Sequence, residues 1–209
     1  MTSSALKAAG TSSPLRRAIR RPERTGRQDL SCQLCGAGVA DLHRHLFDDH
    51  SGELLCACHP CTVLFDRDAA GGEHYRLIPD RRVRLDAFAA QGLGIPVGLA
   101  YFVVQRDGAV VANYPSPLGA TTYEVEPAQW RAVIDQCADV ATVSPLVEAV
   151  LINTARGARE HWIVPLDDCY RLVAIIRQHW RGLSGGSTVW PAIEEFFAEL
   201  ETGNRHFGI

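Results

Sequence analysis

The sequence predicts an α+β fold, in which a small metal-binding module precedes a mostly antiparallel sheet packed with helices. Three observations support this prediction. Five of the seven cysteines fall within residues 32–61, apolar runs separated by turn signals follow them, and two amphipathic segments close the chain. The 209 residues are 46% hydrophobic and 22% charged, which is the composition of an ordinary globular protein.

Composition divides the chain into four segments. The first holds seven basic residues against one glutamate and is rich in Ser, Thr, Ala and Gly, so it cannot bury enough apolar surface to order itself. The predicted segments are a disordered basic tail (1–28), a metal-binding ribbon (29–66), a connector (67–94) and an α+β domain (95–209).

Charge and hydropathy exclude several classes of function. The net charge of −3 gives no reason to expect nucleic acid as a partner. No apolar stretch approaches the 18 or more residues of a membrane span, and the start of the chain has no apolar core of a secretory signal. An odd cysteine count without such a signal favours reduced thiols in the cytoplasm over a disulfide framework.

The cysteine segment contains two pairs with the spacing of a tetrahedral metal site. Cys32 and Cys35 form the first CxxC turn, Cys58 and Cys61 form the second, and Gly36 allows the tight bend after the first. Four thiolates suit zinc or iron. Zinc would make a structural ribbon, whereas iron would make a rubredoxin-like electron carrier.

Three further residues leave the ligand set open. Cys56 can replace Cys58, remain a spectator, or belong to a second metal centre. His43 and His45 make the last idea possible because an HxH pair on a strand points to one side. The alternative for each histidine is a surface or capping role without a metal.

The remaining elements are predicted from apolar periodicity and turn residues. Strands are expected at residues 99–104, 110–111, 121–125, 147–153 and 161–164. Helices are expected at residues 128–138, 166–180 and 189–200. Asp107-Gly108 predicts a hairpin turn between the first two strands.

A charged stretch near the C-terminal helices offers a weaker candidate site. Its members lie around a predicted hairpin tip and helix start: Arg156, Arg159, His161, Asp167 and Asp168. Such a tip can bind a carboxylate or phosphate, or be a solvated loop before a helix with an acidic first turn. The sequence lacks GxSxG, Walker and GxGxxG motifs, so it nominates no catalytic residue.

Several long phrases of the sequence resemble a bacterial family of unassigned activity, encoded beside nickel-iron uptake hydrogenase genes. The matching phrases are CQLCGAG, HRHLFD, ELLCACHPC, YRLIPDRRVRLD, NYPSP and ARGAREHWIVPLDDCYRLVAIIRQHWRGLSGG. The resemblance covers roughly residues 30–200. The cysteine segment also resembles the zinc-ribbon and rubredoxin-like modules of other hydrogenase accessory proteins, whose pattern maps onto Cys32, Cys35, Cys58 and Cys61.

The resemblance implies a part in hydrogenase assembly, maturation or electron delivery. We therefore expect a non-enzymatic cytoplasmic accessory protein that binds zinc and acts by binding a hydrogenase subunit or another maturation factor. The alternative is a rubredoxin-like iron carrier that serves the hydrogenase, and an enzyme using the Arg156–Asp168 region is a third hypothesis.

Overall fold

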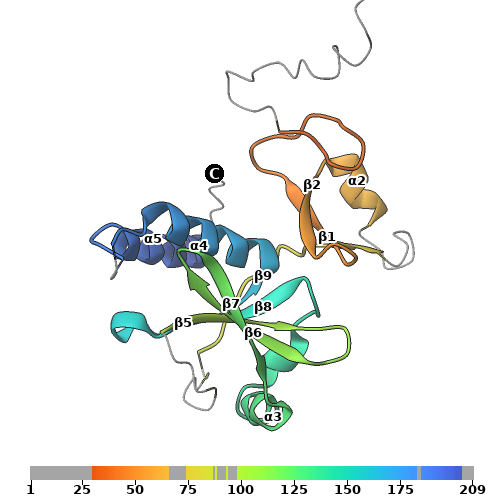
Figure 1. The fold of residues 1–209 in the computed structure, drawn as a ribbon. Coiled ribbons are helices and arrows are strands. Elements are labelled where there is room, and N and C mark those ends of the chain that lie inside the picture. The colour runs from red at the N-terminus through yellow and green to blue at the C-terminus, as the bar shows by residue number, and fades with distance from the viewer. Residues whose placement is uncertain are drawn as a thin grey trace, which may run out of the picture.

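The computed structural model describes residues 30–65, 74–86, 88, 93, 98–182 and 185–203. The basic tail predicted over residues 1–28 lies outside this part of the chain. The described residues form a mixed α/β fold with two antiparallel sheets (Figure 1). In this part of the chain, no helix is long and apolar enough to cross a bilayer.

The first sheet is small and carries the cysteine segment. Its strands are β1 (Arg44–Asp48), β2 (Glu53–Ala57) and β3 (Tyr75–Leu77), in the order β2-β1-β3. Gly52 closes the β1–β2 hairpin with a φ of +71°, a backbone conformation that other residues rarely adopt. The short helix α2 (His59–Leu64) follows β2 directly.

The second sheet has six strands in the order β4-β9-β8-β5-β6-β7, and each neighbouring pair is antiparallel. The strands are β4 (Val83–Arg84), β5 (Leu99–Val104), β6 (Val110–Ser116), β7 (Gly119–Val125), β8 (Glu148–Asn153) and β9 (Glu160–Pro165). The segment between residues 67 and 94 thus supplies β3 to the small sheet and β4 to the large one.

Helices cover both faces of the large sheet. They are α3 (Pro127–Gln136), α4 (Leu166–His179) and α5 (Val189–Thr202), with short 3-10 turns η3 (Ala138–Thr142) and η4 (Ala155–Gly157). Helices α4 and α5 lie side by side on one face, and α3 lies on the other (Figure 1).

Strand β5 shows why the sequence forms a central strand here. The strand predicted over residues 99–104 is a continuous apolar run, and its side chains alternate between the two faces. Tyr101 and Val103 pack with α4 and α5, whereas Ala100 and Phe102 pack with α3. Because both faces of β5 are buried, polar and apolar residues do not alternate along this strand.

The two sheets meet in one of the apolar clusters of the molecule. Phe47 of β1 and Ile78, just after β3, pack in the cluster that contains the α4 and α5 side chains. Ile78 is only 1% exposed. The cysteine segment is therefore anchored on the face of the large sheet that α4 and α5 cover.

Candidate metal centre

The first cysteine pair lies on a tight turn before β1. The backbone N–H of Cys32 donates to Ala37 O at 2.7 Å, and the N–H of Gly36 donates to Cys32 O at 2.8 Å. Gly36 has a φ of +77°, which agrees with the tight bend inferred for it. Gln33 ties this turn to β2, because its backbone N–H donates to Cys56 O and its side chain accepts from the Cys56 N–H.

The second pair lies at the start of α2 and is not a second free turn. Cys58 is the N-cap residue of α2, with extended backbone, and Cys61 lies in the first helical turn. Pro60 fits this position because the first helical amides need no partner within the helix. The order of elements is thus turn, hairpin and helix, which differs from the paired CxxC turns of the expected ribbon.

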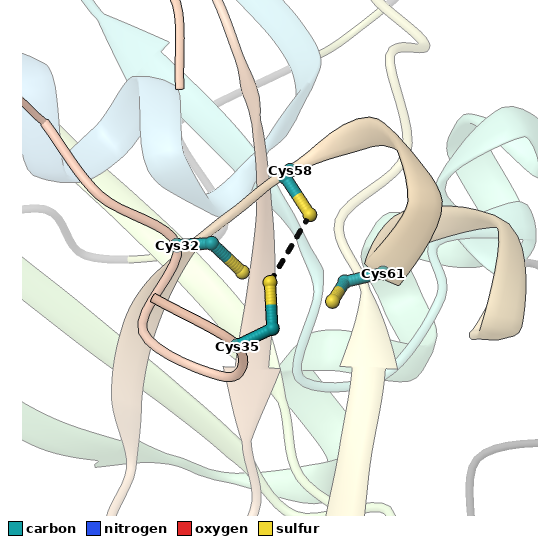
Figure 2. A group of neighbouring side chains, drawn as sticks. All are labelled: Cys32, Cys35, Cys58 and Cys61. Atoms are coloured by element: carbon teal, nitrogen blue, oxygen red, sulfur yellow. Dashed lines mark hydrogen bonds between the residues drawn. The ribbon is translucent and has the colours of Figure 1, made fainter. Parts of the chain in front are cut away.

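These elements bring four sulfurs together. The four Sγ atoms all lie within 4.8 Å of one another; they belong to Cys32, Cys35, Cys58 and Cys61. Figure 2 shows the four side chains pointing toward a common centre. The Sγ atoms of Cys35 and Cys58 are 3.6 Å apart. Two sulfurs at 2.3 Å from one tetrahedral zinc ion would lie about 3.8 Å apart, so the spacing fits such an ion. All four thiols are free of disulfides.

The electrostatics of the four thiols differ. Burial opposes ionisation of Cys32, but backbone N–H groups of Cys58, Cys35 and Leu34 outweigh it and lower the Cys32 pKa to about 6. The neighbouring Cys58 thiol and burial raise the pKa of Cys61 to about 12. The Ala37 backbone favours ionisation of Cys35, yet the Cys58 and Cys32 side chains raise its pKa overall.

The backbone therefore stabilises the thiolate form of Cys32. The raised pKa values of Cys35 and Cys61 show that ionisation of further thiols in the cluster is unfavourable. A divalent cation removes that opposition, because it attracts all four sulfurs at once. The cluster can thus hold a metal ion, while its geometry does not distinguish zinc from iron.

Cys56 is not part of this cluster. It lies with His43 and His45 in a second group, in which one ring nitrogen of each histidine and the Cys56 sulfur are within 4.8 Å of one another. Burial, together with the negative charge of Cys32, raises the pKa of the Cys56 thiol. The structure therefore separates the seven candidate ligands into a group of four and a group of three.

The charged stretch from Arg156 to Asp168 does not form one site. The Arg156 guanidinium lies over the Trp190 ring at 5.6 Å and 3.9 Å from Glu194. Asp168 instead accepts two hydrogen bonds from Arg82, at 2.7 and 2.9 Å. The expected acidic first turn of α4 is present, but its carboxylates are buried rather than solvated.

Two partnerships were not predicted from the sequence. His45 Nδ1 lies 3.0 Å from Asp167 Oδ2, and Arg82 forms a buried pair with Asp168. The partners are 122 and 86 positions apart in the chain. In the sequence, these partnerships were indicated only by two adjacent carboxylates among apolar residues, because carboxylates that become buried need partners.

The fold and the cluster define a class of protein with mixed α/β architecture, antiparallel sheets and a cluster of four cysteines that is consistent with a zinc-ribbon-like site. The chain belongs to the DUF5947 family, described as a family of unknown function, whose model matches residues 31–204. Searches of curated proteins and of solved structures found no significant match.

Proposed function

We propose that this chain is a non-enzymatic cytoplasmic accessory protein for nickel-iron hydrogenase assembly or maturation. It holds a structural zinc ion on Cys32, Cys35, Cys58 and Cys61, and it acts by binding a hydrogenase subunit or another maturation factor. The closed cluster of four sulfurs is the observation that supports the structural metal ion.

A closed cluster favours a structural role over catalysis. Four cysteine sulfurs complete a tetrahedral shell, so no position remains for water or substrate. The ion would instead fix α2 against the turn that holds Cys32 and Cys35, because each of these elements supplies two of the sulfurs. Such a cross-link stiffens a module whose own apolar core is small.

Helix α2 also offers apolar side chains for a partner. Val63 and Leu64 are 59% and 58% exposed, and they follow Cys61 and the buried Thr62 in the same helix. Adjacent exposed apolar residues on a rigid element suit a protein interface. The proposed link to hydrogenase rests on the resemblance of the long sequence phrases to the family encoded beside hydrogenase genes. We assign helix α2 as the surface that contacts the partner protein.

The alternative is a rubredoxin-like carrier with iron on the same four sulfurs. Cys35 is the exposed member of the cluster, which would bring an iron centre close to solvent and to a redox partner. Elemental analysis and a visible spectrum of protein purified from its own host separate the two proposals. A colourless protein with one zinc in the cluster supports the structural role, whereas a red protein that bleaches on reduction supports the carrier.

Partner binding is tested by affinity purification of the tagged full chain from its own host, followed by mass spectrometry. We expect hydrogenase subunits or maturation factors to co-purify with the wild-type chain and to be lost with Val63→Asp. Leu118→Asp is the matched control, because Leu118 is 97% exposed but lies at the β6–β7 turn of the large sheet. Absence of every hydrogenase component from the wild-type sample would refute the proposed partner.

A further inference from the structure

The group formed by His43, His45 and Cys56 has the construction of a second metal site. His45 of β1 lies directly opposite Cys56 of β2 in the antiparallel register. Side chains of such directly opposed residues lie on the same face of the sheet. His43 precedes His45 by two residues, and the centroids of the two rings are 4.8 Å apart.

Both imidazole rings are oriented through Nδ1. His43 Nδ1 lies 2.9 Å from Ala40 O, and His45 Nδ1 lies 3.0 Å from Asp167 Oδ2. A carbonyl or carboxylate oxygen only accepts, so Nδ1 is the donor in each contact, and in the neutral imidazole the lone pair then lies on Nε2. Metal-binding histidines typically have this arrangement, with the second nitrogen held by a carboxylate or backbone carbonyl.

Asp167 gives this orientation from a distant part of the chain. It lies in the first turn of α4 and is only 4% exposed. A buried carboxylate beside a histidine fixes the tautomer and the orientation of its imidazole ring. The β1–β2 hairpin therefore meets α4 at the residue that would support a metal ligand.

We propose that His43, His45 and Cys56 bind a second ion, of the zinc class, with three protein ligands and an open fourth position. Tetrahedral zinc would place such nitrogen and sulfur atoms about 3.3–3.6 Å apart, so small side-chain rotations from the present spacing of up to 4.8 Å would complete the site. Blue copper sites share these ligands but usually add an axial methionine, and the single methionine of this chain is Met1.

A hollow on the protein surface lies beside His43. His43 lines a hollow of about 890 Å³, together with Arg44, Arg82 and Trp162. Its guanidinium groups are already matched, because Arg44 pairs with Asp80 and Arg82 pairs with Asp168. The hollow therefore adds no strong net positive charge beside the proposed ion.

The test is metal titration of the full chain, stripped of metal and kept reduced. We expect two zinc ions per wild-type chain, and one for His45→Gln and for Cys56→Ser. His50→Gln is the control, since His50 lies in the turn of the same hairpin, is exposed and stacks on His74. A wild-type chain that binds a single ion, or a Cys56→Ser variant that still binds two, would overturn the proposal.

Cobalt distinguishes the second site from the four-cysteine cluster. When zinc has filled the first site, added Co²⁺ should give a thiolate-to-cobalt absorption band that disappears in Cys56→Ser. Asp167→Asn should weaken this Co²⁺ binding about 10- to 100-fold, as expected for loss of the group that orients a ligand. His50→Gln should leave the band unchanged, because His50 belongs to neither group of ligands. Zinc content measured in the same samples shows whether the first site is filled, so failure of the first site and failure of the second have different signatures.

Discussion

Cys35 and Cys56 carry the same side chain but lie in different environments. Cys35 is on a tight turn with its sulfur 3.6 Å from that of Cys58, whereas Cys56 is on a strand opposite His45. The backbone conformation at each cysteine sets the direction of its side chain, and this direction determines which group of ligands the thiol joins. Substitution of single cysteines therefore tests the assignment of the metal ligands most directly.

Replacing Cys35 with serine should remove the ion from the four-cysteine cluster. A neutral hydroxyl is a poor substitute for a thiolate on zinc, so we expect about one zinc fewer per chain and a lower melting temperature. Zinc content and thermal melts measure the two effects. Cys137→Ala is the control, because Cys137 is buried at the end of α3, outside the cluster. Retention of the full zinc content by Cys35→Ser would contradict the assignment.

Metal binding at this cluster should weaken as the pH falls. In the metal-free chain the pKa of Cys61 is about 12 and that of Cys35 is raised, so binding must displace protons from these thiols. In the metal-bound chain the sulfurs are thiolates, so stability from the ion is present at high pH and lost on acidification. Zinc affinity measured between pH 8 and pH 5 should fall steadily, and an affinity independent of pH would argue against thiolate ligands.

Removing one partner of the Arg82–Asp168 pair should be costly. The two side chains are 8% and 0% exposed, and the arginine donates two hydrogen bonds to the carboxylate. Arg82→Ala removes both hydrogen bonds from the buried Asp168 carboxylate and leaves it only the Arg171 guanidinium, 3.8 Å away. Breaking a buried pair in this way typically lowers the free energy of unfolding by about 3–5 kcal/mol. Chemical denaturation measures it, with exposed Arg159→Ala as a near-neutral control. A change below about 1 kcal/mol for Arg82→Ala would contradict the role of the pair.

At the scale of elements, strand β5 is joined to the β8–β9 connection by an unusually close contact. Gly98 O accepts from the N–H groups of Thr154 and Ala155, at 2.6 and 2.9 Å. A Cβ atom on residue 98 would lie 2.5 Å from the Ala155 Cα. Position 98 therefore requires glycine because the Ala155 backbone lies too close for a side chain. This requirement arises from the tertiary structure, so the local sequence does not predict it.

Gly98→Ala should force β5 and the 3-10 turn η4 apart. Relief of such overpacking commonly costs about 1–3 kcal/mol, which denaturant unfolding would detect. Gly38→Ala is the control, because nothing lies within 4 Å of a Cβ atom built there. Equal stability of the two variants would show that the contact relaxes without cost.

At the scale of the whole molecule, the small sheet and the large sheet are coupled through Phe47 and Ile78. Both pack in the cluster that contains Trp162 and contacts Trp190. All four tryptophans lie between residues 130 and 190, outside the cysteine segment. Tryptophan fluorescence therefore reports on the large sheet and its helices, and it can reveal whether metal at the small sheet stabilises them.

Chelation of the metal should lower the melting temperature seen by tryptophan fluorescence. An ion present at about 100 times its Kd adds about 2.7 kcal/mol to the folded state. For a chain of this size that corresponds to about 5–10 °C. Parallel melts with and without a chelator, with zinc content measured, provide the test. An unchanged fluorescence melt in zinc-free protein would show that the two sheets unfold independently.

Local sequence was sufficient to predict much of the architecture. The apolar run at residues 99–104 is β5, Asp107-Gly108 lies between β5 and β6, and the two amphipathic segments are α4 and α5. These features depend on the periodicity of apolar residues and on turn chemistry, which act over a few positions. The spacing of Cys32, Cys35, Cys58 and Cys61 likewise indicated the cluster, because the two cysteines of each pair lie on one short segment that brings their sulfurs together.

Only the tertiary structure decided how distant residues are paired. Cys56 lies with His43 and His45 because the register of β1 and β2 places it opposite His45. Asp167 and Asp168 meet His45 and Arg82 because the hairpin and the loop before β4 pack on the start of α4. Such contacts join residues about 80 to 120 positions apart, and buried charges acquire partners from whichever segment the common core brings beside them.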